Sequence, residues 1–106
     1  MATRRRHSDE VVATIRDQDE VGQFTSARQL LRQHLLCVRE IPNGRDFLFS
    51  GSLEQIQEAL RRLVQIEHKY SRFLQFDHAQ VEEYFLLRIV GLPDHEEVIQ
   101  TYFEGE

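Results

Sequence analysis

The longest regular hydrophobic pattern runs from Ser52 to Phe76, where a helical repeat passes into an alternating, strand-like repeat without a Gly or Pro break. At about 100° per residue, several apolar side chains fall on one arc of this helix. They are Ile56, Leu60, Leu63 and Val64. Ser52 and Gln55 have the spacing of a capping box. The pattern predicts a long amphipathic helix with one face on the core.

Alternating patterns on both sides of this helix predict two hairpins. The first has strands at 36–41 and 46–50, joined by Pro42-Asn43-Gly44-Arg45, where Asn-Gly supplies the two positive φ angles of a type I′ turn. The second has strands at 72–78 and 83–90 with a turn at 78–83. Two hairpins joined by a helix predict one four-stranded, mostly antiparallel sheet.

Helical patterns also occur near both ends of the chain. One begins at Thr25 or Ser26. Pro93 opens a last helix, whose apolar side chains are expected to pack on the sheet and are Val98, Ile99, Tyr102 and Phe103. Residues 8–20 carry only a thin apolar stripe, and DQDE at 17–20 is typical of a solvated connector. We therefore predict an N-terminal arm over 1–23, partly disordered or a short helix, and a single α+β domain over 24–106.

The predicted order is helix, strand, strand, helix, strand, strand, helix. This order favours an α+β two-layer sandwich with helices on one face of the sheet. Phe73, Tyr84 and Leu86 are expected on the other face, which is then more apolar than a fully solvated face requires. Either the N-terminal segment or a second copy of the chain is expected to cover it.

Composition narrows the range of functions. The chain has 106 residues, enough for one domain, and a formal charge of -5. Arg4, Arg5 and Arg6 form a basic triplet, so the rest is more acidic still, which disfavours nucleic-acid binding. The triplet is interpreted as a solvated arm, and deletion of Met1 to His7 is expected to leave the melting temperature nearly unchanged. With no apolar run for a membrane span or a signal peptide, we expect a cytosolic, non-membrane protein.

Few residues have side chains and spacing typical of a catalytic, metal or cofactor site. Cys37 is the only cysteine, which excludes an internal disulfide, and a lone thiol usually behaves as a small buried hydrophobe. His78 and His95 fall in a turn and at a helix start with no reason to converge, so we expect no metal centre and no cofactor. No phosphate-binding glycine loop or hydrolase motif is present, so no catalytic residue is assigned.

Glu67 is the anomaly, because it falls near the middle of the apolar arc of the central helix. A buried carboxylate must find hydrogen-bond donors or become protonated. Tyr70, Ser71, a backbone amide or an arginine such as Arg88 could supply them. The favoured interpretation is a structural carboxylate, and the alternative is a ligand pocket lined by Glu67, Tyr70, Ser71 and Arg88.

Three stretches carry a resemblance to a family: REIPNGRDFLF at 39–49, IEHKYSRFLQF at 66–76 and FLLRIVGLPDHEEVIQTYF at 85–103. They resemble a family of small, mostly uncharacterised bacterial proteins with a hairpin of the form E-x-P-D-G-Y-x-F-x-F and a helix end E-R-x-C-C-P-F. Where that family has two adjacent cysteines, this chain has Tyr70 and Ser71, and only the glutamate, Glu67, is kept. The thiol chemistry that the resemblance implies therefore does not transfer.

Three functional classes follow. The favoured one is a non-enzymatic interaction or regulatory module that acts as a homodimer or docks on a protein partner, because catalytic constellations are missing and the second sheet face is apolar. The second is a small-ligand or metal-binding protein built around Glu67, Tyr70 and Ser71. The third, an enzyme, has the least support.

Overall fold

The computed structural model describes residues 7–50 and 54–104. Helices and a four-stranded antiparallel sheet follow in the order α-α-β-β-α-β-β-α, which confirms the predicted α+β class. The first half contains α1 (His7–Thr14), α2 (Gln18–Gln33), β1 (Leu35–Ile41) and β2 (Gly44–Ser50). The second half contains α3 (Glu54–Tyr70), β3 (Gln75–Val81), β4 (Tyr84–Val90), a 3-10 turn η1 (Pro93–His95) and α4 (Glu96–Gln100).

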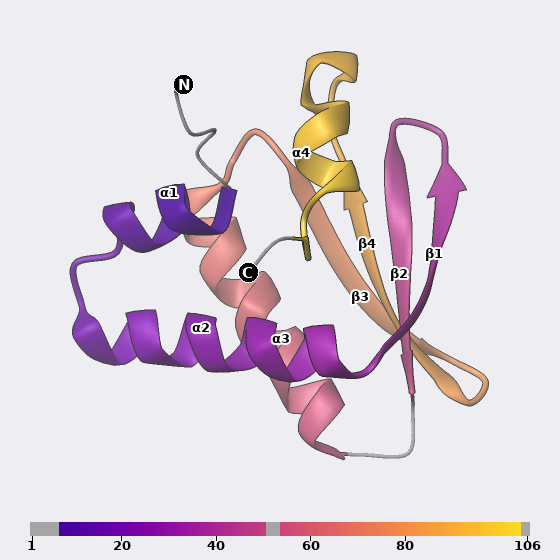
Figure 1. The fold of residues 1–106 in the computed structure, drawn as a ribbon, viewed down its shortest axis with the longest axis horizontal. Helices are drawn as coiled ribbons and strands as arrows, with labels where there is room; N and C mark the ends of the chain where they lie inside the picture. Colours follow the sequence, from indigo (N-terminus) through magenta and orange to yellow (C-terminus); the bar gives the residue numbers. More distant parts are fainter. Residues whose placement is uncertain (1–6, 51–53, 105–106) are drawn as a thin grey trace.

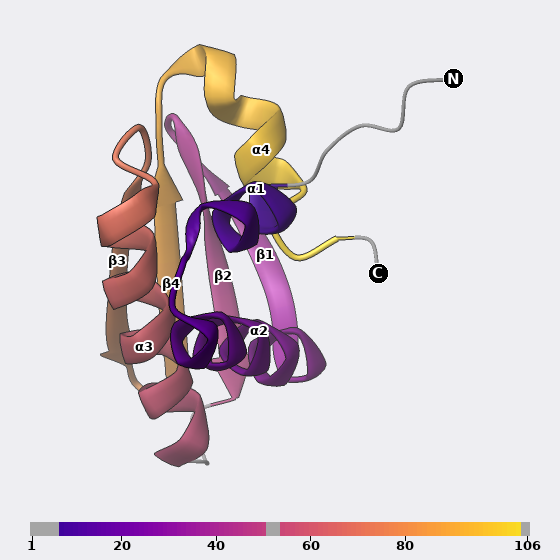
Figure 2. The same ribbon diagram turned by 90° about the vertical axis from the view of Figure 1, so that its left-hand side faces the viewer.

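The sheet has the strand order β1-β2-β4-β3, and every neighbouring pair is antiparallel. The helices gather on one side of it, as the two views in Figures 1 and 2 show. Between the two layers lies a core rich in phenylalanine, with Phe24 from α2 and Phe47, Phe49 and Phe76 from the strands all fully buried. Among the described residues, no helix is long and apolar enough to cross a membrane.

The first hairpin turns one residue earlier than the type I′ prediction placed it. Pro42 and Asn43 form the turn, and Asn43 alone has a positive φ, 64°. Proline fixes φ near −65°, so the pair follows the pattern of a type II turn with Pro before a positive-φ residue. Gly44 belongs to β2 instead, where an added Cβ would lie 2.1 Å from the carbonyl oxygen of Ile89.

In the second hairpin the first strand is displaced by three residues from its prediction, whereas β4 lies within one residue of the predicted 83–90. β3 covers Gln75–Val81 rather than 72–78, and the turn is the short pair Glu82-Glu83, in which Glu82 has a φ of 55°. No Gly, Pro or Asn marks this turn in the sequence, so the usual signals failed. Phe73 therefore precedes the strand, and its ring packs against those of His7 and His95 rather than on the second sheet face.

The N-terminal half also differs from the predicted boundaries. α2 begins at Gln18, not at Thr25 or Ser26, because Asp17 caps it by accepting a 2.9 Å hydrogen bond from the backbone N–H of Asp19. The DQDE stretch is thus a helix start, where acidic groups complement the macrodipole. The described part of the predicted arm, residues 7–23, forms α1 and the start of α2, so the predicted boundary between arm and domain falls inside a helix. α1 lies beside α3 (Figure 2). Arg4, Arg5, Arg6 and the predicted N-cap Ser52 lie outside the described residues.

Candidate functional site

Glu67 occupies the core face of α3, one turn before the helix ends at Tyr70. Its side chain is completely buried, like those of Ile56, Leu60 and Leu63 on the same helix. Removing a carboxylate from water is costly unless donors replace the lost hydration. The surroundings of Glu67 therefore decide whether its role is structural or chemical.

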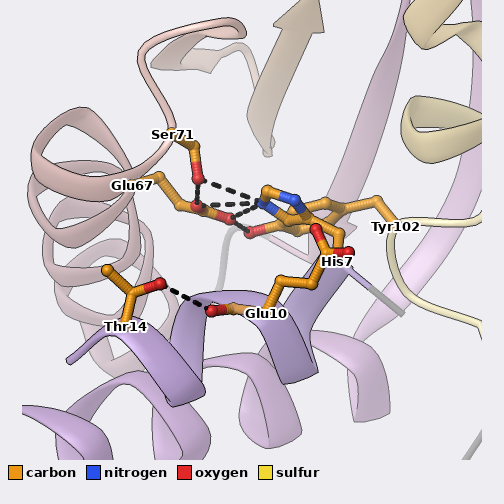
Figure 3. A network of polar contacts seen from close by, with 6 residues as sticks. All are labelled: His7, Glu10, Thr14, Glu67, Ser71 and Tyr102. Atoms are coloured by element: carbon orange, nitrogen blue, oxygen red, sulfur yellow. Dashed lines mark hydrogen bonds and ion pairs between the residues drawn. The ribbon is translucent and has the colours of Figure 1, made fainter. Parts of the chain in front are cut away.

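Three side chains from three separate parts of the chain meet this carboxylate (Figure 3). Ser71, just after α3, donates from Oγ to Oε1 over 2.6 Å. Tyr102, after α4, donates from its hydroxyl to Oε2 over 2.5 Å. Nε2 of His7, the first residue of α1, lies 3.1 Å from both carboxylate oxygens. These four residues, here called the Glu67 cluster, tie α1 and the C-terminal segment to the end of α3.

The tyrosine of this cluster stays a donor over the whole physiological pH range. Burial, followed by the negative charge of Glu67, raises the pKa of Tyr102 well above its ordinary value. The guanidinium of Arg28 lies 4.9 Å from the centre of the same ring, a cation–π contact. Tyr102 thus separates a buried cation from a buried carboxylate, and its hydroxyl hydrogen is committed to Glu67.

The cluster contains Ser, His and Glu, but it is not arranged as a nucleophile with its base. Ser71 donates its single hydroxyl hydrogen to Glu67, and Nε2 of His7 faces Glu67 and lies 3.2 Å from the serine oxygen. In a catalytic triad the acid binds the other ring nitrogen, whereas Nδ1 of His7 is buried and has no hydrogen-bond partner in the part of the chain that the structure describes. Ser71 is also only 1% exposed. The geometry fits a structural network.

The structure brings together only two of the four predicted pocket residues. Ser71 does bind Glu67, but the Tyr70 hydroxyl points away and donates to Glu20 on α2. Arg88 lies on the opposite face of the sheet, where it binds Asp46. Tyr70 and Arg88 are therefore not partners of Glu67, because the last turn of α3 directs Tyr70 toward α2 and the pleat of β4 directs Arg88 outward.

Two members of the Glu67 cluster were missed from the sequence. Tyr102 was assigned only to packing, although the hydroxyl of a buried tyrosine usually finds a partner, which was a usable signal. His7 belongs to the segment interpreted as an arm, and no sequence signal places it against residue 67. Because its side chain is only 5% exposed and contacts Glu67, His7 does not belong to a dispensable tail.

The second candidate site is the sheet face that the described helices leave uncovered, here called the open face. One cross-strand row on it is apolar and consists of Cys37, Leu48, Leu86 and Ala79. Val81 and Tyr84 extend it toward one end of the sheet and are 50% and 41% exposed. Cys37 is exposed as well, so its interpretation as a buried hydrophobe is wrong. It lies on an edge strand, where the outward face meets solvent.

The next row of the open face is charged and alternates in sign across the sheet as Arg39, Asp46, Arg88 and Asp77. Asp46 is fully buried beneath the two arginines, with Arg88 at 2.7 and 2.9 Å and Arg39 at 3.0 Å. Hydrogen bonds from Arg88 and then Arg39 hold the pKa of Asp46 below its ordinary value. Asp46 is therefore ionised at neutral pH, and the row carries two charges of each sign.

Comparisons with known proteins add no further site. No family model matches the sequence, and no curated protein or solved structure is detectably similar to it. Within residues 7–50 and 54–104, no three His, Cys, Asp or Glu side chains form a group that could hold a metal ion. The two arrangements with functional potential are thus a buried polar cluster, already filled by the chain's own donors, and an open face that pairs an apolar row with a charged one.

Proposed function

We propose that this protein is a non-enzymatic interaction module that acts as a homodimer through the open face. The observation that carries this proposal is the self-complementary pattern of that face. Its apolar row presents surface whose removal from water is worth about 25 cal/mol per Å². The alternative, a ligand pocket at Glu67, has less support because three donors of the chain already occupy the carboxylate.

A two-fold axis parallel to the strands and between β2 and β4 would place β1 of one copy over β3 of the other. In that arrangement Arg39 faces Asp77 of the second copy, and Asp46 faces Arg88. The apolar row matches in the same way, with Leu48 opposite Leu86 and Cys37 opposite Ala79. Each charge then meets its opposite, which is the requirement for an isologous interface without like-charge repulsion.

The size of the open face sets the expected affinity. Each strand has seven residues. At about 3.4 Å per residue and about 4.8 Å between strands, the face measures roughly 24 by 19 Å. Two such faces bury about 900 Å², which is below the roughly 1,200–2,000 Å² of stable interfaces and in the range of weak, transient ones. We therefore expect a reversible dimer with a micromolar dissociation constant.

The decisive experiment is sedimentation equilibrium across 1–200 μM protein, roughly the range in which such a dimer dissociates. The parent is expected to move from the 12.6 kDa chain mass toward twice that mass. Ala79→Arg adds a large charged side chain to the exposed apolar row without removing a core group, and it should keep the protein monomeric. Ala13→Arg makes the same change on the exposed side of α1 and serves as the matched control. A parent that stays monomeric at every concentration would refute the proposal.

Cross-linking tests the orientation of the two copies. Stacked sheets lie about 10 Å apart, beyond the Cα separation of about 7 Å that a disulfide allows, so a short bismaleimide is the suitable reagent. Ala79→Cys should give covalent dimers, because residue 79 faces the partner's exposed Cys37. Parent chains should not be linked, since their Cys37 residues would be about 17 Å apart. Ala13→Cys is the control, and efficient linking of the parent would contradict this two-fold.

A further inference from the structure

We propose that the hollow between α1 and α2 is a binding site for a small oxyanion, with phosphate as its simplest form and Arg28 as its principal ligand. The hollow has a volume of about 170 Å³ and is lined by residues of α1 and α2. These two helices lie on the helical side of the sheet, away from the open face (Figure 2). Its role is therefore independent of dimer formation.

Arg28 is the observation that points to a ligand. This residue is only 7% exposed, yet its Nη1 atom is buried without a hydrogen-bond partner among the described residues. The guanidinium packs on aromatic rings instead, 4.9 Å from the centre of Tyr102 and 5.5 Å from that of Phe103. Buried charges in proteins are normally paired. Arg28 lines the hollow, and a buried guanidinium with one unsatisfied nitrogen is an arrangement that an anion would complete.

The rest of the lining suits an oxyanion. Ser8 and Thr25 offer hydroxyl groups, Gln29 offers an amide, and Arg32 lies one turn of α2 beyond Arg28. Ser8 belongs to the first turn of α1, where the helix dipole also favours negative charge. Asp9 is the one acidic residue in the lining. Arginine binds phosphate and carboxylate through paired N–H groups, which fits the planar cation at this position.

Volume limits the size of the ligand. At about 30 Å³ per water molecule, the hollow holds the equivalent of about six waters. This space accommodates one compact oxyanion group together with bridging waters, but not a nucleotide or a peptide. The phosphate group could be free or carried by a small phosphomonoester whose remainder extends into solvent, and the two sources are separable by experiment.

The test is calorimetric titration of the full chain with inorganic phosphate and, separately, with glycerol phosphate, against chloride at matched ionic strength. We expect saturable binding with one phosphate group per chain and a higher melting temperature in phosphate. Arg28→Gln should weaken binding by about ten- to a hundredfold, the range for losing hydrogen bonds to a charged group. Arg16→Gln removes an exposed arginine after α1 and should bind like the parent. Binding of the ester alone would assign the site to a carried phosphate group.

A second variant keeps the test valid if Arg28→Gln fails to fold. Gln29 is exposed, so Gln29→Glu leaves the core intact and adds a negative charge to the lining. It should reduce phosphate affinity at least tenfold, whereas Gln23→Glu, on the same helix but outside this hollow, should not. Identical melting temperatures in phosphate and chloride with no binding heat for either compound, or parent-like binding by Arg28→Gln or Gln29→Glu, would overturn the proposal.

Discussion

Replacing Glu67 distinguishes a structural carboxylate from a ligand-binding one. Glu67→Gln keeps the shape and one acceptor oxygen, whereas Glu67→Leu fills the space but removes both acceptors. In the structure the carboxylate accepts from Ser71 and Tyr102 and contacts His7. A structural role predicts that the free energy of unfolding falls in the order parent, Gln, Leu.

The magnitudes follow from the donors that lose their acceptor. In Glu67→Gln, bonds to a charged group become bonds to a neutral amide and one donor loses its acceptor, for a cost of about 2–4 kcal/mol. In Glu67→Leu, three buried donors lose their acceptor at about 1–3 kcal/mol each, partly offset by about 2 kcal/mol of apolar burial. The net cost of the leucine variant is therefore about 1–7 kcal/mol, centred above that of the glutamine variant, out of the roughly 5–15 kcal/mol that stabilises a typical domain.

Urea unfolding at pH 7 measures these differences, with Tyr102→Phe to isolate one bond. The double variant Glu67→Gln/Tyr102→Phe should show a coupling energy of about 1–3 kcal/mol, while exposed Tyr84→Phe should be uncoupled. A leucine variant as stable as the parent would refute the structural account. Native mass spectrometry of the parent and Glu67→Gln provides a second check, since a small molecule lost with the carboxylate would favour a ligand site.

Two further predictions concern His7 in the Glu67 cluster and Asp46 in the charged row of the open face. His7→Ala should lower the free energy of unfolding by about 1–3 kcal/mol, because it removes the contact with Glu67 and the ring contacts with Phe73 and Tyr102; His78→Ala on β3 is the exposed control in the same urea assay. Asp46 has a lowered pKa in the folded state, so its stabilising contribution is present above the ordinary value of 3.8 and lost as pH falls through the folded value. Acid titrations should show the stability gap between the parent and Asp46→Asn narrowing below that pH, and a constant gap would contradict the assignment.

Local patterns sufficed for the fold class because periodicity and helix length are properties of short stretches. The apolar arc from Ile56 to Val64 and the alternation in β4 both lie where they were predicted. The errors occurred where distant partners decide the outcome. β3 begins three residues later than its own alternation suggests, because pairing with β4 sets the register from Gln75↔Val90 to Val81↔Tyr84. The two-residue turn Glu82-Glu83 contains no Gly, Pro or Asn, so the local sequence does not indicate that register.

The same distinction separates the predictable and unpredictable parts of the candidate sites. Glu67 was detectable because a carboxylate breaks the apolar pattern on the core face of its helix. Ser71 was detectable because it lies one helical turn away on the same face. His7 is 60 residues from Glu67 along the chain, so no spacing rule connects them. The charged row can be recognised only when the complete strand order β1-β2-β4-β3 is known, because that order places Arg39 and Asp77 at the two ends of the row. Self-complementarity is thus a property of the assembled sheet, which is why the sequence indicated an apolar second face without the orientation of its partner.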